Sequence, residues 1–158
     1  MVPLQIKGFF LDREKMPIAV LCDDAGGRVL PVWIGPSEAN SIIVRLEKIK
    51  TPGPLTHDLL AETFLRHGFR LDRLEIYDRS DAHGYAARIR YHRRLRHFEM
   101  DVRPSDGLAL AVRLQVPVFA REELLASGNV SALMACLTDP AQGLLFLHAP
   151  REAASVGG

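Results

Sequence analysis

The sequence predicts an α+β fold, a mixed β-sheet with packed helices, because groups of strand-like runs are followed by helix-like runs along its 158 residues. Apolar residues make up 47% and charged residues 25% of the chain, which is typical of a globular domain. No apolar run reaches the length of a membrane span. We expect one domain over residues 1–126, a helical C-terminal extension over 127–150 and a flexible tail over 151–158.

Three strands are predicted at the start of the chain. Leu4–Asp12 is the first, and the β-branched runs Ile18–Asp23 and Arg28–Ile34 follow it. The loop between these two runs contains Gly26 and Gly27, which indicates a β-hairpin.

Two helices are predicted next. Pro36-Ser37-Glu38 precedes apolar residues at helical spacing as far as Ile49, and an acidic first turn suits a helix N-terminus. Thr51-Pro52-Gly53-Pro54 breaks this helix. A second helix is expected over His57–His67, with Thr56 as its N-cap.

The remaining elements are three strands, a helix and several short pieces. Ser105 is expected to cap the helix, which runs from Pro104-Ser105-Asp106 to about Leu114. The strands are Phe69–Tyr77, Tyr85–Tyr91 and Phe98–Val102. The short pieces are a strand at Val116–Phe119 and helices at Arg121–Ala126 and Val130–Leu137.

Parts of the sequence recur at an offset of 68 residues, where Pro36-Ser37-Glu38 aligns with Pro104-Ser105-Asp106. Val44-Arg45-Leu46 likewise aligns with Val112-Arg113-Leu114. This predicts an internal duplication of a strand–turn–helix unit, with Glu38 and Asp106 at equivalent helix N-termini. Chance similarity is the alternative, because few positions are identical.

Arginine is concentrated in one segment of a chain whose net charge is only +1. Between Tyr85 and His97 there are five arginines, two histidines and no acid. Glu99 and Asp101 on the following strand are candidate partners for some of them. The surplus predicts contact with the phosphates of DNA or RNA, whereas arginine-rich codon usage is the alternative explanation. The candidate nucleic-acid-binding residues are Arg88, Arg90, Arg93, Arg94 and Arg96.

The N-terminus lacks the pattern of a signal peptide, and the two cysteines cannot form a disulfide framework or a zinc site alone. We therefore expect a cytoplasmic protein that does not bind membranes. Common nucleotide-binding and metallohydrolase motifs are not found in the sequence.

Two polar clusters are candidate sites. In the first, His57 is a candidate general base beside Asp58, and the alternative is helix capping with charge compensation. In the second, the carboxylates of Asp101 and Asp106 suit a divalent cation such as Mg²⁺ or the activation of water, while Arg103 suits a phosphate. The alternative there is an Asp101–Arg103 ion pair and an acid at a helix N-terminus.

Three ordered motifs resemble the bifunctional nuclease domain family over about residues 4–125. They are Val29–Ala39, Pro54–Leu60 and Asp101–Asp106. The family commonly has Pro-Arg-Pro before its Thr-His-Asp-Leu motif, whereas this chain has Pro52-Gly53-Pro54 and lacks that arginine.

The resemblance implies an α+β fold, a homo-oligomer that is most simply a dimer, and cleavage of DNA and RNA with little sequence preference. The residues on the family motifs are Glu38, His57, Asp58, Arg103 and Asp106, which we take as candidate catalytic residues. The leading hypothesis is a non-specific nuclease. The alternatives are a non-catalytic nucleic-acid-binding or regulatory module, and a scaffold that recruits a protein partner.

Overall fold

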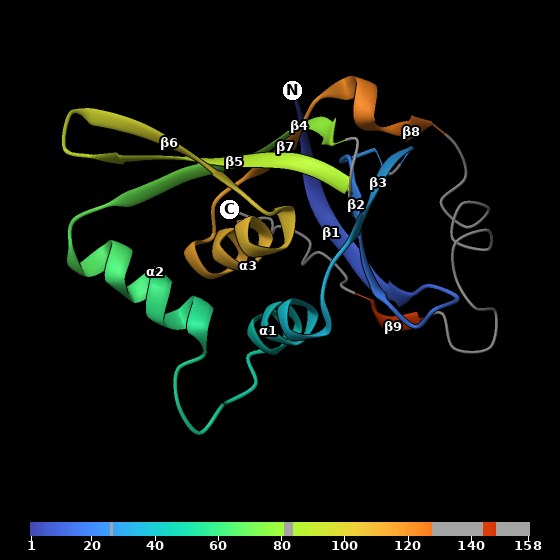
Figure 1. Cartoon of the computed structure of the whole chain (residues 1–158), viewed down its shortest axis with the longest axis horizontal. Helices are drawn as coiled ribbons and strands as arrows, with labels where there is room; N and C mark the ends of the chain where they lie inside the picture. Colours follow the sequence, from blue (N-terminus) through green and yellow to red (C-terminus); the bar gives the residue numbers. More distant parts are fainter. Residues whose placement is uncertain (26, 81–83, 128–143, 148–158) are drawn as a thin grey trace, which may run out of the picture.

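The computed structural model describes residues 1–25, 27–80, 84–127 and 144–147. These residues form a mixed sheet and three α-helices, which confirms the predicted α+β fold (Figure 1). The helices are α1 (Pro36–Leu46), α2 (Thr56–Arg66) and α3 (Pro104–Leu114). The strands are β1 (Val2–Leu11), β2 (Pro17–Cys22), β3 (Arg28–Trp33), β4 (Arg70–Ser80), β5 (Gly84–Arg93), β6 (Arg96–Val102), β7 (Val118–Ala120), β8 (Ala126–Ser127) and β9 (Leu144–Leu147).

The strands of the sheet lie in the order β6-β5-β4-β7-β1-β2-β3-β8, and β9 pairs with β1 outside this order. The β4–β7 pair is parallel, and the other described pairs are antiparallel. The expected hairpin of β2 and β3 is present, with Ile18 opposite Trp33 and Cys22 opposite Val29.

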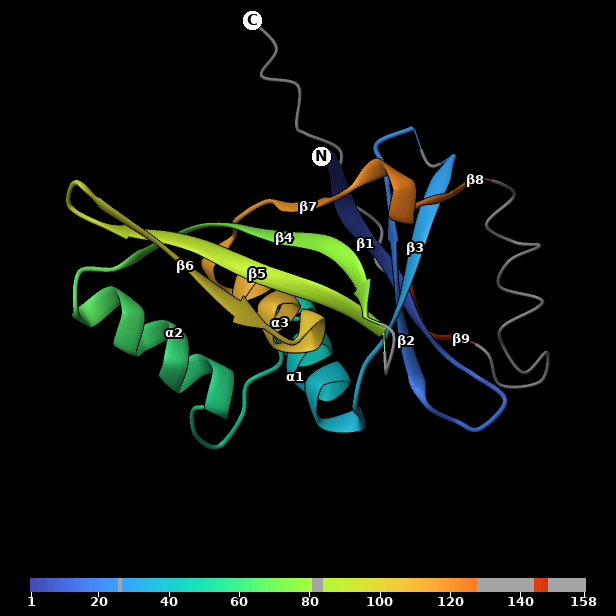
Figure 2. The same ribbon diagram turned by 45° about the horizontal axis from the view of Figure 1, so that its top comes forward.

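All three helices lie on the same side of the β4–β5–β6 part of the sheet (Figures 1 and 2). α3 packs in the centre, where Leu108 is fully buried among side chains such as Leu74 and Ile89. Gly107 allows this close approach, because a β-carbon there would meet the side chains of Leu74 and Val102. The opposite face of β4, β5 and β6 carries charged side chains.

The strand–turn–helix unit occurs twice, as the sequence offset predicted. β3 leads into α1 and β6 leads into α3, and the bounds of the two helices differ by the same 68 residues as the motifs. Each helix begins with proline, whose fixed φ suits the first position of a helix.

Two predicted helix caps were wrong. Arg103 is the N-cap of α3 and Leu55 is the N-cap of α2, so Ser105 and Thr56 lie inside the first turns. The position of Pro104 explains the first case, because proline is favoured at the first helical residue. In the second, Asp58 accepts a hydrogen bond from the backbone N–H of Leu55, which replaces a side-chain cap.

The C-terminal part differs from the prediction. In place of a helix over Arg121–Ala126, a short 3₁₀ turn at Glu122–Leu124 leads into β8. Within the expected helical extension, the described residues are Ser127 of β8 and strand β9, which pairs with β1. The predicted helix Val130–Leu137 and the tail 151–158 lie outside the described residues. No helix in the described ranges is both long and apolar enough to cross a membrane.

Candidate functional site

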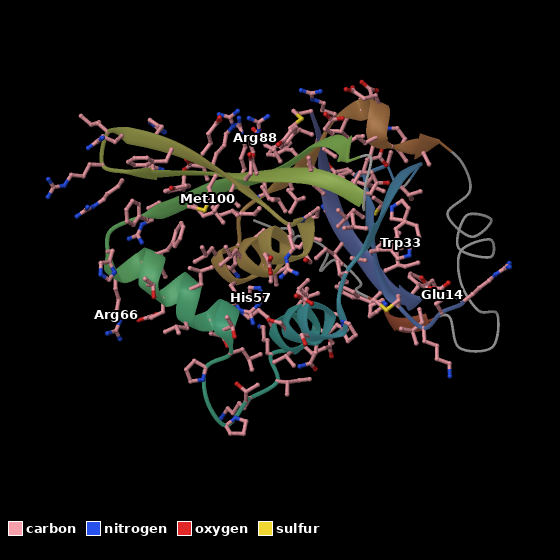
Figure 3. The ribbon with its side chains drawn as sticks, in the orientation of Figure 1. Glu14, Trp33, His57, Arg66, Arg88 and Met100 are labelled. Carbon is pink, nitrogen blue, oxygen red and sulfur yellow. The ribbon has the colours of Figure 1, made fainter. Side chains whose placement is uncertain are left out.

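The N-terminal turns of α1, α2 and α3 meet at one polar cluster. Glu38 is the third residue of α1 and Asp106 the third residue of α3, while His57 is the second residue of α2. Figure 3 shows His57 directed from α2 toward the other two helices. Each helix contributes the positive end of its dipole, which favours negative charge at this place.

His57 connects the three helices. Its Nε2 lies 3.1 Å from Oδ1 of Asp106, and its Nδ1 lies 3.0 Å from Oγ of Ser41 on α1. Only 14% of the His57 side chain is exposed, against 29% for Asp106. The solvent-facing member of this pair is therefore Asp106.

The neighbours of His57 define the direction of its hydrogen bonds. Arg113, which has only donors, gives a hydrogen bond of 2.8 Å to Ser41 Oγ. The Ser41 hydroxyl is then free to donate to His57 Nδ1, while Nε2–H donates to the Asp106 carboxylate. With the proton on Nε2, both contacts of the His57 ring are hydrogen bonds.

Arg103 joins the two acidic residues at the helix N-termini. Its Nε donates to Asp106 Oδ2 at 2.6 Å, and its Nη2 lies 3.1 Å from both Asp106 Oδ1 and Glu38 Oε1. The side chain is 69% exposed although it makes these contacts. A guanidinium held by two carboxylates and open to solvent is well placed to contact a phosphate.

Asp106 is held in its ionised form. Burial raises its pKa, but hydrogen bonds from Arg103 and His57 outweigh that effect, and the net pKa is lower than usual for aspartate. Glu38 is also partly enclosed, since its carboxylate lies against Gly35 in the turn before α1. A β-carbon at position 35 would meet Glu38 Oε2, so the end of the Glu38 side chain would have to shift.

Asp58 has a different position from the other candidates. Its Oδ2 accepts the Leu55 backbone N–H at 2.8 Å, and its Oδ1 accepts Nε of Arg113 at 2.7 Å. These bonds outweigh the effect of burial and lower the pKa of Asp58. Through these two bonds Asp58 links the start of α2 to Arg113 on α3.

Asp101 does not join the cluster. Its carboxylate accepts a hydrogen bond from the Tyr77 hydroxyl at 3.2 Å on the far side of the sheet. The expected Asp101–Arg103 ion pair is not among the contacts of the described residues, where Arg103 pairs with Glu38 and Asp106. Asp101 and Asp106 therefore do not form a shared carboxylate site for Mg²⁺.

The five candidate arginines fall into two groups, of which the first lies on the open face of the sheet. Figure 3 shows Arg88 on this face. Arg88 and Arg90 both pair with buried Glu75 and with Glu99. Arg73 also binds Glu75, so three arginines share the two carboxylates of Glu75 and Glu99 and the charge of this group is compensated only in part.

The second group is Arg93, Arg94 and Arg96 at the exposed tip of the β5–β6 hairpin, which extends beyond α2 in Figure 1. Within the part of the chain that the structure describes, these three arginines make no ion pair. Arg93 lies over the ring of Phe69 and Arg96 over the ring of Phe98, which orients two of the three guanidinium groups.

Comparison with known protein families matches residues 19–132 to the bifunctional nuclease domain. The chain belongs to the bifunctional nuclease domain family. It is also similar to two uncharacterized proteins of Mycobacterium tuberculosis, MT1877 of strain CDC 1551 / Oshkosh and Rv1829 of strain H37Rv. Each is 34% identical over 117 residues, which cover 74% of this chain and 69% of the relative.

The motif residues of this bifunctional nuclease domain come together in the polar cluster at the N-terminal turns of α1, α2 and α3, which we call the helix-end cluster. Glu38, His57, Arg103 and Asp106 are linked by hydrogen bonds although they come from three motifs far apart in the sequence. Gly53, where the family commonly has arginine, lies in the loop before α2 with open space around it. The loop therefore has room for the missing side chain.

Ser41 and Arg113 were not identified from the sequence as parts of the site. Arg113 is only 7% exposed and bridges Ser41 and Asp58. One signal was available, because Arg113 follows Asp106 by seven residues and therefore lies on the same face of α3. A charged side chain at a buried helix position indicates a polar partner in the core.

Proposed function

We propose that this member of the bifunctional nuclease domain family hydrolyses phosphodiester bonds of DNA and RNA with little sequence preference. The observation that carries the proposal is the linked set Glu38–Arg103–Asp106–His57 at three helix N-termini. It combines a solvent-exposed guanidinium with an ionised carboxylate backed by histidine. Phosphodiester hydrolysis needs these two functions, a group that binds the phosphate and a group that accepts a proton from water.

In the proposed mechanism, Arg103 binds the scissile phosphate and stabilises the negative charge that develops on its oxygens. Asp106 accepts the proton of the attacking water, because it is the more exposed member of the Asp106–His57 pair. As the water oxygen bonds to phosphorus, the bond from phosphorus to the sugar oxygen of the leaving strand breaks, and that oxygen takes a proton from solvent. His57 holds Asp106 through Nε2–H, and Ser41 holds the other imidazole nitrogen. Glu38 keeps Arg103 in place by accepting a hydrogen bond from its Nη2.

The basic hairpin tip supplies binding without sequence recognition. Arg93, Arg94 and Arg96 have no acidic partner among the described residues, so their charge is available to the phosphates of a nucleic acid. Contacts to phosphate carry no sequence information, which suits a non-specific nuclease. Arg88 and Arg90 then support the strand and make a smaller contribution to binding, because they pair with Glu75 and Glu99 and their side chains are less exposed than that of Arg103.

A second candidate function is a nucleic-acid-binding or regulatory module without catalysis. It is favoured by the internal pairing of the cluster, in which Asp106 and Asp58 each accept hydrogen bonds from side chains of the chain itself. In that case the cluster ties three helices together and the hairpin tip carries the function.

The test is cleavage of labelled single- and double-stranded DNA and RNA of mixed sequence, with Mg²⁺ and with a chelator. Cleavage of both polymers supports the nuclease, and its response to the chelator shows whether a divalent cation such as Mg²⁺ takes part. Binding that falls steeply with salt, without cleavage under either condition, selects the binding module.

The proposal also includes a homo-oligomeric state, most simply a dimer, and a cytoplasmic location. Sedimentation of the purified chain measures the oligomeric state.

A further inference from the structure

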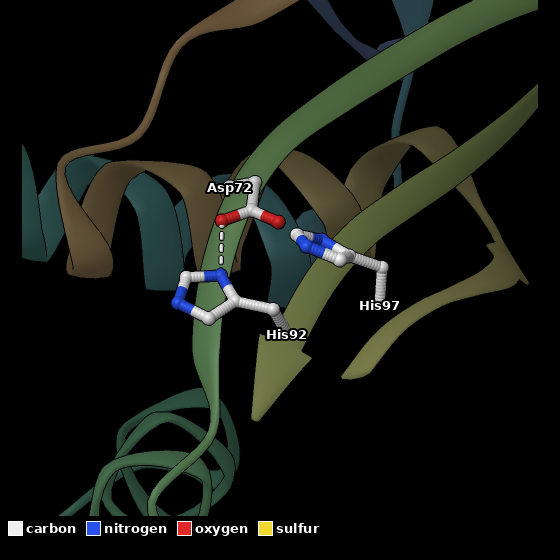
Figure 4. Close-up of side chains that lie close together, drawn as sticks. All are labelled: Asp72, His92 and His97. Atoms are coloured by element: carbon white, nitrogen blue, oxygen red, sulfur yellow. Dashed lines mark hydrogen bonds and ion pairs between the residues drawn. The ribbon is translucent and has the colours of Figure 1, made fainter. Parts of the chain in front are cut away.

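A second group of chemically active side chains lies on the open face of the sheet, away from the helices. Asp72 on β4, His92 on β5 and His97 on β6 place one ligand atom each within 4.8 Å of one another (Figure 4). Among the described residues this is the one group of three histidine, cysteine or acidic side chains with such spacing. None of the three takes part in the proposed nuclease mechanism.

The strand register places these residues together. His92 and His97 are direct partners across the β5–β6 pair, and their ring centres are 5.7 Å apart. The β4–β5 register shifts between Leu71 and Arg73, which makes Asp72 the extra residue of a β-bulge. Such a bulge redirects a side chain, and here Asp72 Oδ1 lies 2.6 Å from His92 Nδ1.

The distances are compatible with a bound ion after small side-chain rotations. Bonds from a transition metal to histidine nitrogen and carboxylate oxygen are about 2.0–2.2 Å, which separates tetrahedral ligands by about 3.3–3.6 Å. Asp72 Oδ1 and His92 Nδ1 are 2.6 Å apart, and the ligand atoms of all three residues lie within 4.8 Å of one another. An ion between them would replace the hydrogen that Asp72 and His92 now share.

The donor set selects the class of metal. Two imidazoles and one carboxylate suit Zn²⁺ and its transition-metal neighbours, whereas Mg²⁺ and Ca²⁺ prefer oxygen ligands alone. Arg70 is the register partner of His92 and adds positive charge on the same face, so Asp72 is the group that makes the cluster favourable for a cation. About a third of the Asp72 and His92 side chains is exposed, which leaves ligand positions open to solvent (35% and 33%).

We propose that Asp72, His92 and His97 form a binding site for a divalent transition-metal ion, with Zn²⁺ as the reference ion. Three protein ligands leave a fourth position for water or for an oxygen of an anionic ligand. The site joins three neighbouring strands beside the basic hairpin tip. It is separate from the helix-end cluster, and the proposal does not depend on nuclease activity.

The experiment is calorimetric titration of the full chain with zinc chloride, with Mg²⁺ in excess as a competitor. We expect one Zn²⁺ per chain and no competition from Mg²⁺. Asp72→Asn and His97→Ala should each weaken binding by at least about tenfold, since changes outside the ligand sphere already cost 10–100-fold. The matched control is His67→Ala, which removes an exposed histidine at the end of α2.

A second measurement keeps the proposal testable if a variant unfolds. In the unmodified chain, Zn²⁺ should shift the imidazole NMR signals of His92 and His97 and leave that of His57 in place. Absence of Zn²⁺ binding, equal affinity in all variants, or a Zn²⁺ shift confined to His57 would overturn the proposal. Lost Zn²⁺ binding with unchanged nucleic-acid cleavage in Asp72→Asn would support it and leave the proposed nuclease site unaffected.

Discussion

His57 and Asp106 are 49 positions apart in the sequence, yet His57 Nε2 lies 3.1 Å from Asp106 Oδ1. The contact joins the first turn of α2 to the first turn of α3. Arg103 extends it to Glu38 on α1, so the N-termini of all three helices share one polar network. Glu38 and Asp106 occupy equivalent positions in α1 and α3, and both contact Nη2 of Arg103.

Arg103→Lys should lower the rate of nucleic-acid cleavage on the order of 10²-fold, the cost of removing a hydrogen-bond donor to developing charge. Lysine provides a single ammonium group and cannot hold Asp106 and Glu38 while contacting a phosphate. The thermal midpoint should change little, because 69% of the Arg103 side chain is exposed. Arg121→Lys, at an arginine whose side chain is 48% exposed and lies outside the cluster, serves as the control and should cleave like the unmodified chain.

Charge reversal at the hairpin tip should weaken binding to unrelated sequences equally. In Arg93→Glu/Arg94→Glu, two phosphate contacts are lost, and each normally contributes roughly 0.9 to the salt slope on B-form DNA. Binding is measured by fluorescence anisotropy over a salt series. The control reverses two exposed charges in the turn between β1 and β2, Arg13→Glu/Lys15→Glu. Equal loss of affinity in both double variants would show that net charge, and not the hairpin, governs binding.

Gly107→Ala should destabilise the fold, whereas Gly53→Ala should not. A β-carbon at position 107 meets the fully buried Leu74 side chain and lies 3.3 Å from Val102 Cγ2, while position 53 has open space. Overpacking costs about 1–3 kcal/mol, which exceeds the roughly 1 kcal/mol that alanine gains over glycine within a helix. Urea unfolding of both variants measures the difference, and equal midpoints would refute the packing explanation.

Acid should destabilise the protein through carboxylates whose pKa is lowered by folding. For Glu75, burial raises the pKa, but hydrogen bonds from Arg90 and Arg73 more than offset it. A lowered folded pKa contributes stability above the ordinary carboxyl range near about pH 4, and this contribution is lost as pH falls through the folded pKa. The pKa values of Asp58 and Asp106 are also lowered by folding, so these two carboxylates also lose stabilising interactions as pH falls.

Glu75→Gln tests this account. It should lower the free energy of unfolding at neutral pH by about 1–3 kcal/mol, the usual range for hydrogen bonds to a charged group. It should also reduce the loss of stability below about pH 4. Glu99→Gln is the control, because Glu99 also pairs with Arg88 and Arg90 but is 55% exposed. The same pH dependence in Glu75→Gln and the unmodified chain would contradict the assignment to Glu75.

Local patterns were sufficient to predict most of the fold. The turns Pro36-Ser37-Glu38 and Pro104-Ser105-Asp106 combine proline and an acid where a helix begins, and both helices start there. Strand β9 was not predicted, because its pairing with β1 depends on a contact between the two ends of the chain.

The sequence was sufficient to predict which motif residues are candidates for the site, but not which of them are in contact. The sequence motifs contain Glu38, His57 and Asp106, but no local pattern indicates that α2 places His57 against α3. The ion-pair partners of Arg88 and Arg90 could likewise be predicted only in part. Glu99 was an expected partner, whereas Glu75 was not, because its contact depends on the register between β4 and β5.

The most direct test of the central claim is the cleavage rate of Asp106→Asn on labelled RNA and DNA, compared with its thermal midpoint. The substitution keeps the shape of the side chain but removes the proposed proton acceptor, so the rate should fall on the order of 10²-fold or more. Asp101→Asn, which changes an exposed aspartate on the other face of the sheet, should cleave normally. Cleavage by Asp106→Asn near the rate of the unmodified chain, with only a lowered midpoint, would assign the cluster to helix packing and contradict the nuclease site.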